Sequence, residues 1–141
     1  MRGILLGVIL LLSTGLARAD ETMTADDARR AALSGEVTLV DIRTPEEWAE
    51  TGVPDVAHAL NMKSDGFVRD LLTLYNQHPE RPLAVICATG GRSGYVTEVL
   101  AQRGMTRIVN VPEGMFGAGG EPGWLARSLP VRTPEAPRTS N

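Results

Sequence analysis

The residues best suited to chemistry lie in one short run, residues 87–93, which reads Cys-Ala-Thr-Gly-Gly-Arg-Ser. An apolar run over residues 83–86 precedes it and predicts a buried strand that ends in the thiol of Cys87. Gly90 and Gly91 allow a tight turn, and a helix is predicted to begin near Ser93. Backbone N–H groups that converge in such a turn bind an anion, and a helix N-terminus adds free donors. This arrangement predicts a nucleophilic thiol whose covalent adduct carries negative charge.

Arg92 adds a permanent positive charge to the same turn. A cation and converging N–H groups both favour the thiolate of Cys87 over the neutral thiol. We therefore expect the sulfur at the floor of an electropositive cradle that is open to solvent. The alternative is a buried structural cysteine followed by an ordinary turn, because free cysteine often packs as a small apolar residue.

Apolar strands alternate with helical segments along the chain, an order typical of an α/β fold with a mainly parallel sheet. Besides residues 83–86, strands are predicted over residues 37–42, 58–60 and 108–111. Helices are predicted over residues 24–35, from residue 44, over 64–76 and from residue 93 to Gly104. In such sheets, sites form beyond the carboxyl ends of the strands, which is where Cys87 is expected.

The run at residues 87–93 resembles the active-site loop Cys-x-x-Gly-x-Arg-Ser of the single-domain rhodaneses, a family of sulfurtransferases. Residues 39–43, Leu-Val-Asp-Ile-Arg, resemble the Asp-x-Arg strand end of that family. Residues 45–48, Pro-Glu-Glu-Trp, resemble the helix that follows it. The Cys loop and the Asp-x-Arg element in this order make a specific signal.

Two further stretches extend the resemblance over about residues 23–131, nearly the whole chain after its N-terminal segment. Residues 52–61 resemble the family's Gly-His-Ile-Pro-Gly-Ala-x-Asn stretch, and residues 110–114 with Trp124 resemble its Gly-Gly…Trp end. Three positions depart from that pattern, and we expect them to rim the pocket: Val53, Asp55 and Glu113.

The resemblance implies a rhodanese-like α/β fold, with a sheet of about five mainly parallel strands flanked by helices on both faces. It implies that Cys87 is catalytic: the thiol attacks the sulfane sulfur of a small anionic donor such as thiosulfate, releases sulfite and becomes a persulfide. Asp41 is implied to be structural and to hold Arg43. The residues implied to bind the substrate are Ala88, Thr89, Gly90, Gly91, Arg92, Ser93 and Arg43.

A thiophilic acceptor would then take the sulfur: cyanide in an assay, and in the cell a thiol, which can be a protein thiol. The resemblance implies neither a metal ion nor an organic cofactor. One Cys and two His are also too few for a structural zinc site. The net charge of −3 disfavours a dedicated nucleic-acid-binding protein, because such domains are usually basic.

Two other functions remain open at the sequence level. Related cell-cycle phosphatases and arsenate reductases have one more residue between Cys and Arg, which widens the cradle for a tetrahedral phosphate. Here only residues 88–91 separate Cys87 from Arg92, so a Cys-dependent phosphatase ranks low. A redox or partner-binding module with the same loop, which holds sulfur without turnover, is the nearer alternative.

The N-terminal segment has the three regions of a secretory signal peptide. Met1 and Arg2 give a positive start, residues 4–12 are almost wholly apolar, and Ala17-Arg18-Ala19 provides small residues before a cleavage site. The apolar run is shorter than the roughly 20 residues that span a bilayer. We therefore predict a periplasmic protein with a cleaved signal (residues 1–19), no membrane segment in its mature form, a single domain (residues 20–131) and a flexible Pro-rich tail (residues 132–141).

Overall fold

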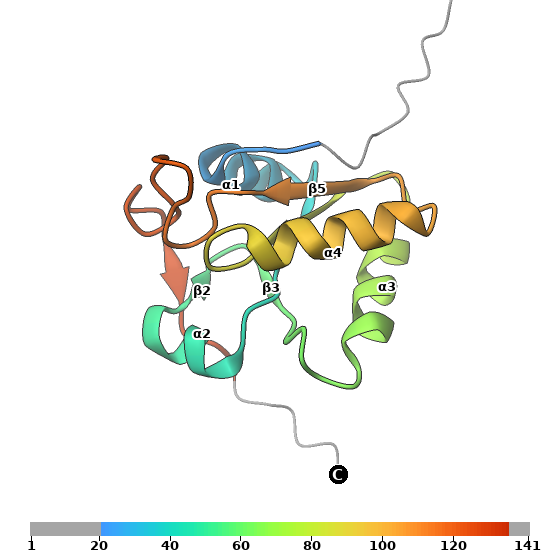
Figure 1. Ribbon diagram of the computed structural model, residues 1–141, viewed down its shortest axis with the longest axis horizontal. Coiled ribbons are helices and arrows are strands. Elements are labelled where there is room, and N and C mark those ends of the chain that lie inside the picture. Colours follow the sequence, from blue (N-terminus) through green and yellow to red (C-terminus); the bar gives the residue numbers. More distant parts are fainter. Residues whose placement is uncertain (1–20, 136–141) are drawn as a thin grey trace, which may run out of the picture.

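The computed structural model describes residues 21–135, so the predicted signal over residues 1–19 and most of the predicted tail lie outside the described residues. Helices and strands alternate in the described part (Figure 1). The helices are α1 (Ala25–Ser34), α2 (Pro45–Thr51), α3 (Phe67–Gln77) and α4 (Gly91–Gln102). The strands are β1 (Thr38–Asp41), β2 (Val53–Pro54), β3 (His58–Ala59), β4 (Leu83–Ile86), β5 (Ile108–Val111) and β6 (Val131–Arg132).

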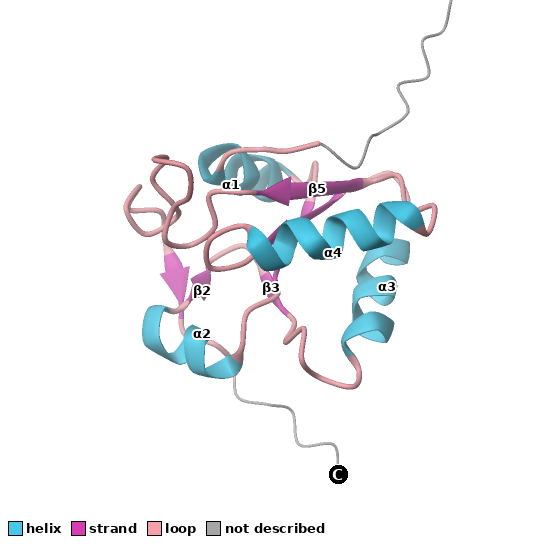
Figure 2. Cartoon of the chain, in the orientation of Figure 1, coloured by secondary structure: helices cyan, strands magenta, loops and turns pink. Residues whose placement is uncertain are grey.

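Four of the strands form a parallel sheet in the order β3-β1-β4-β5 (Figure 2). The register places Val40 of β1 opposite His58 of β3 and opposite Val85 of β4. Because all four strands run the same way, their carboxyl ends meet at one edge of the sheet. The prediction of an α/β fold with a mainly parallel sheet is confirmed, and Cys87 lies at that edge.

The sheet has four strands where about five were expected. A fifth segment is present only as an isolated parallel bridge between Thr22 and Asn110 of β5, with Met23 N–H donating to the Asn110 carbonyl at 3.0 Å. β2 and β6 form a separate two-stranded antiparallel sheet. Arg132, the first residue of the predicted tail, belongs to β6 and also donates to the Ala57 carbonyl at 2.8 Å.

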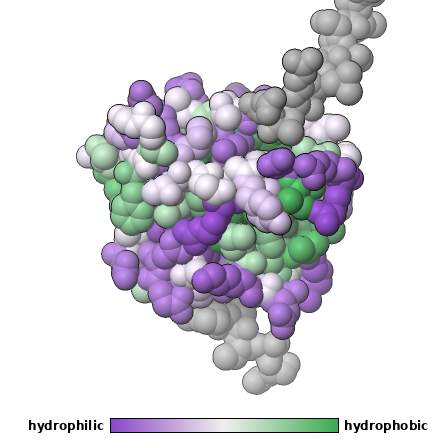
Figure 3. Space-filling view, in the orientation of Figure 1, coloured by the Kyte–Doolittle hydropathy of each residue, from purple (hydrophilic) through white to green (hydrophobic). Residues whose placement is uncertain are grey.

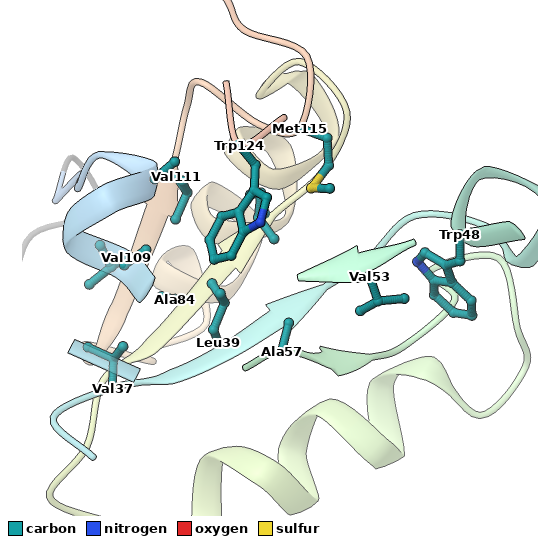
Figure 4. Close-up of a cluster of buried hydrophobic side chains, with 13 residues drawn as sticks. Val37, Leu39, Trp48, Val53, Ala57, Ala84, Val109, Val111, Met115 and Trp124 are labelled. Carbon is teal, nitrogen blue, oxygen red and sulfur yellow. The ribbon is translucent and has the colours of Figure 1, made fainter. Parts of the chain in front are cut away.

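Side chains of the parallel strands alternate between two buried clusters, one on each face of the sheet. The cluster drawn in Figure 4 holds Leu39 and Ala84, together with Trp48 of α2 and Trp124 from the loop after β5. The cluster on the other face holds side chains from α3 and α4 and includes Cys87. Helical elements thus cover both faces, as expected, and Cys87 points toward α3 and α4.

Capping side chains fix where the first two helices begin. Thr24 accepts the Asp27 N–H at the start of α1. In α2, Thr44 and Glu47 form a reciprocal capping box, and Pro45 occupies the first helical turn. These helices begin where the sequence predicts, because their signals are local. α4 begins at Gly91, two residues earlier than expected, because Gly90 already adopts the left-handed conformation that precedes the helix.

The surface of the described residues carries both hydrophilic and hydrophobic side chains, and hydrophobic side chains are exposed on α3 and in the loop that follows β5 (Figure 3). Val68 and Leu72 of α3 are exposed, and so is Phe116 of that loop. Between residues 21 and 135, none of the helices combines the length and the apolar character that crossing a bilayer requires.

A fully buried ion pair lies where β1 ends. Arg43 donates from Nη2 to Asp41 Oδ2 at 2.7 Å, and both side chains are 0% exposed. The remaining donors of the guanidinium bind Thr51 Oγ1, the Gly52 carbonyl and the Glu47 carbonyl. Arg43 therefore ties the end of β1 to α2 and to the turn before β2.

We expect Arg43→Met to lower the free energy of unfolding by about 3–5 kcal/mol, because it leaves the buried carboxylate of Asp41 without its partner. Urea-induced unfolding measures this loss. Arg30→Met is the matched control, since Arg30 pairs with Asp27 at the surface and its removal should change little. Adding Asp41→Asn to Arg43→Met should recover part of the stability. A loss no larger than that of the control would contradict the burial argument.

Candidate active site

Cys87 follows β4 directly, and the chain turns at Gly90 into α4. Figure 1 shows this loop at the N-terminal end of α4, beside the loop that follows β5. The two loops touch: a Cβ on Gly90 would lie 2.1 Å from the Pro112 carbonyl oxygen, and one on Gly114 would lie 2.4 Å from the Ala88 carbonyl oxygen. The loop after β5 therefore packs tightly against the Cys87 loop and restricts its conformation.

Hydrogen bonds between the two loops set the direction of the peptide groups after Cys87. Met115 N–H donates to the Cys87 carbonyl at 2.9 Å, and Phe116 N–H donates to the Ala88 carbonyl at 2.9 Å. In a trans peptide the C=O and the following N–H point in opposite directions, and no peptide bond among the described residues is cis. Drawing both carbonyls outward therefore turns the next N–H groups toward the inside of the Cys87 loop.

Hydrogen-bond donors that follow Cys87 in the chain lie close to its sulfur. Ser93 N–H lies 3.4 Å from Sγ, and the Ser93 hydroxyl lies 3.4 Å from Sγ. Ser93 is the third residue of α4, so its N–H has no carbonyl partner within the helix. Burial raises the pKa of Cys87, but hydrogen bonds from Ser93 and from the N–H groups of Thr89 and Gly90 outweigh it and hold the pKa below its ordinary value.

The thiol is less accessible than expected. Only 1% of the Cys87 surface is exposed, so the prediction of a cradle open to solvent is wrong. The reason is its position: the side chain joins the buried cluster beneath α4, where Val96 also packs. Apolar side chains are nevertheless not its only neighbours, because Ser93 and the loop N–H groups also contact the sulfur. Cys87 is thus shielded from water but lined by donors.

The structure requires a glycine at only one of the two glycine positions of the loop. Gly90 has φ of +86°, and its close contact with Pro112 excludes any side chain. Gly91 is the first residue of α4 and has open space where a Cβ would be. The tight turn that we predicted from both glycines therefore requires Gly90 alone.

Arg92 lies at the start of α4, and its guanidinium forms a two-pronged ion pair with Glu47 of α2. Nη2 donates to Oε1 at 2.5 Å and Nη1 donates to Oε2 at 2.8 Å. Hydrogen bonding from Arg92 lowers the pKa of Glu47 to about 2, so the carboxylate is ionised at any physiological pH. No local sequence pattern marks Glu47 as a site residue, because 45 positions separate it from Arg92.

Arg43 does not occupy the substrate-binding position implied by the resemblance. Its side chain is fully buried, and all five of its N–H donors are used by Asp41, Glu47, Thr51 and Gly52. No donor remains for a substrate, so Arg43 supports the fold together with Asp41. Asp41 has the structural position that we expected, holding Arg43.

The three positions that depart from the family pattern make contacts within the fold. Val53 is fully buried, and Asp55 pairs with Arg29 of α1 at 2.7 Å. Glu113 accepts the Ala25 N–H at 2.9 Å, which caps α1, and accepts Arg127 at 2.8 Å. Long-range pairing of this kind leaves no trace in local sequence pattern.

Nothing in the described site is built to hold a metal ion. Within residues 21–135, no group of three or more His, Cys, Asp or Glu side chains is arranged for that purpose. The donors around Cys87 are N–H and hydroxyl groups, which bind anions rather than cations. The arrangement can therefore stabilise a thiolate, or a single negatively charged atom attached to it.

Comparison with known proteins places the chain in a family. The family of rhodanese-like domains matches residues 24–119 of the chain. A sulfurtransferase from Allochromatium vinosum is 30% identical over 112 residues, which cover 77% of this chain and 90% of the relative. A protein from Rickettsia prowazekii of uncharacterised function is 27% identical over 104 residues, covering 70% of this chain and 85% of the relative.

Solved structures share the fold. The Rv0390 protein from M. tuberculosis has a TM-score of 0.64 at 25% identity, covering 83% of this chain and 99% of that chain. The polysulfide-sulfur transferase homodimer from Wolinella succinogenes has a TM-score of 0.58 at 27% identity, covering 87% of this chain and 85% of that chain. The whole described unit thus corresponds to nearly complete chains of similar size.

Ser93→Ala should raise the pKa of Cys87, because it removes the hydroxyl donor while the N–H of residue 93 remains. Since the pKa of the folded wild type lies below the ordinary value, the thiolate of the variant should form only at higher pH. Ultraviolet absorbance of the thiolate across a pH titration measures the shift. A titration that coincides with that of the wild type would refute the role of the hydroxyl.

Gly114→Ala should distort the Cys87 loop, because the new methyl group would meet the Ala88 and Cys87 carbonyl oxygens. Gly119→Ala is a matched control: φ is +62° there against +63° at Gly114, but nothing lies within 4 Å of its Cβ position. Both variants carry the left-handed cost of about 1–2 kcal/mol. Only Gly114→Ala should also raise the pKa of Cys87. Equal thiol titrations in the two variants would contradict the claim that contact with the loop after β5 sets the conformation of the Cys87 loop.

Proposed function

The chain belongs to the family of rhodanese-like domains, and from this premise we propose that it is a sulfurtransferase that carries sulfane sulfur as a persulfide on Cys87. The single observation that carries the proposal is the set of donors around Sγ, to which Ser93 contributes its N–H and its hydroxyl. A nucleophile that works as a thiolate needs such donors, and so does an adduct that stays anionic.

The first half of the reaction forms the persulfide. The thiolate of Cys87 attacks the outer sulfur of thiosulfate, the S–S bond of the donor breaks with its electron pair, and sulfite leaves. One sulfur atom is transferred, and the enzyme carries one negative charge before and after the step. The charge moves from Sγ to the terminal sulfur, and we expect the N–H groups of the loop to donate hydrogen bonds to it there.

The second half returns the enzyme to the thiolate. A thiophilic acceptor, either cyanide or a thiol, attacks the terminal sulfur, and the electron pair of the breaking S–S bond returns to Sγ of Cys87. No external oxidant or reductant takes part, because the transferred sulfur keeps its oxidation level. The loop spans four residues between Cys87 and Arg92, and this short span suits one sulfur atom better than a tetrahedral phosphate.

We place this chemistry in the periplasm on the strength of the signal pattern over residues 1–19. The mature chain would then carry a single cysteine, which has no partner for a disulfide within the chain. The 1% exposure of Cys87 suits such a compartment, because a shielded thiol reacts slowly with bulky disulfides.

A second candidate function follows from the same shielding. A thiol that is 1% exposed could receive sulfur and release it only slowly, as a sulfur-holding or partner-binding module would. The two functions differ in turnover rather than in the persulfide itself. Steady-state release of sulfite with cyanide as acceptor separates them, because a module would release about one sulfite per Cys87 and then stop.

Incubation with thiosulfate should add the mass of one sulfur atom to Cys87, and later addition of cyanide should remove it. Intact-mass spectrometry followed by peptide mapping measures both changes. Cys87→Ser is the matched control, since it keeps a hydroxyl of similar shape but should show neither adduct nor turnover. A wild-type protein that stays unmodified with every sulfane-sulfur donor would overturn the proposal.

A further inference from the structure

Both arginines that the sequence offers to an anionic donor are already held by carboxylates. Arg43 is enclosed with Asp41, and Arg92 is joined to Glu47 by two hydrogen bonds. Arg92 lies close enough to Cys87 for the thiolate to raise its pKa, after the larger contribution of Glu47. Each of the two arginines is therefore part of a neutral ion pair and is not a free cation.

Glu47 is fixed in place independently of Arg92. Its Oε2 accepts the Thr44 N–H at 2.9 Å in the capping box of α2, and its backbone carbonyl accepts Nη1 of Arg43 at 3.4 Å. A carboxylate fixed in this way loses little side-chain freedom when it binds a guanidinium. The pair is only partly exposed, with 32% of the Arg92 side chain and 27% of the Glu47 side chain accessible, so water screens it incompletely.

We propose that Glu47 selects the sulfur donor: by occupying Arg92, it disfavours the thiosulfate dianion relative to a donor of lower charge, such as an alkyl persulfide. This inference rests on the proposed function. To use Arg92, the sulfonate end of thiosulfate must displace two charge-assisted hydrogen bonds and then lie beside the carboxylate of Glu47. An alkyl persulfide avoids both costs, because its carbon end carries no charge.

The step with an alkyl persulfide balances in the same way as that with thiosulfate. The thiolate of Cys87 attacks the terminal sulfur of the donor, its S–S bond breaks, and the electron pair leaves with the alkyl thiolate. Cys87 gains one sulfur and the sum of charges is unchanged. The only negative charge that enters the loop is on the terminal sulfur, close to the N–H groups of Thr89, Gly90 and Ser93.

A purely supporting role for Glu47 predicts the opposite result. If Glu47 serves to hold Arg92 in position for thiosulfate, loss of its charge should weaken the use of thiosulfate. If Glu47 competes with thiosulfate for Arg92, the same loss should strengthen it. The sign of the change therefore separates the two roles without any assumption about its size.

The test is Glu47→Gln, assayed with thiosulfate and with ethyl persulfide as donors. Glutamine at this position still accepts the Thr44 N–H, so the capping box and the fold should persist. We expect the ratio of kcat/KM for thiosulfate to that for ethyl persulfide to rise about three- to tenfold. Inhibition by sulfate, which involves no sulfur transfer, should strengthen in the same variant. Glu46→Gln removes an exposed charge from the same turn and should leave the ratio unchanged.

An unchanged ratio in Glu47→Gln, or a fall, would overturn the inference, and so would an equal rise in Glu46→Gln. Thermal unfolding of each variant shows whether the fold is intact. The proposed function fails separately: it is lost if the wild type forms no persulfide with either donor. If the wild type forms the persulfide but Glu47→Gln does not shift the ratio, only the role of Glu47 is refuted.

Discussion

Two backbone hydrogen bonds set which groups of its own loop face the sulfur of Cys87. The N–H groups of Met115 and Phe116 draw the carbonyls of Cys87 and Ala88 out of the loop, and the planar peptide then turns the following N–H groups inward. Without that anchoring, the carbonyl oxygens could face the sulfur and repel a thiolate. The chemistry of one loop is therefore set by the backbone of another, which touches it only where Gly90 and Gly114 leave room.

The ion pairs form a second connection, which runs from the sheet to the start of α4. Arg43 joins the end of β1 to the carbonyl of Glu47, and the side chain of Glu47 holds Arg92 at the start of α4. Each guanidinium is matched by a carboxylate, so the connection adds rigidity without adding net charge. The site then relies on peptide dipoles to hold an anion, and peptide dipoles suit one small, singly charged atom better than a large dianion.

Local signals in the sequence were enough to predict the helices, the strands and the Cys87 loop. They did not predict the distant residues that contact these elements and that loop. Thr24, Pro45 and the apolar strands act on neighbours a few residues away, so the helices and strands follow from them. The contacts of Glu113 with α1 and of Glu47 with α4 join residues 88 and 45 positions apart. Met115 and Phe116 act through backbone N–H groups, which every residue except proline possesses, so no side-chain pattern marks them.

Shielding of Cys87 and a lowered pKa are compatible because they depend on different things. Exposure measures contact with bulk water, whereas the pKa depends on whether the charged form finds donors. For Cys87, burial raises the pKa and the donors more than reverse that rise, so the thiolate is stabilised without solvent. A thiolate held by the protein keeps no hydration shell that a donor must strip away. In the proposed reaction a donor must therefore reach a shielded sulfur, and the partly exposed pair of Arg92 and Glu47 is better placed than the buried cradle to choose it.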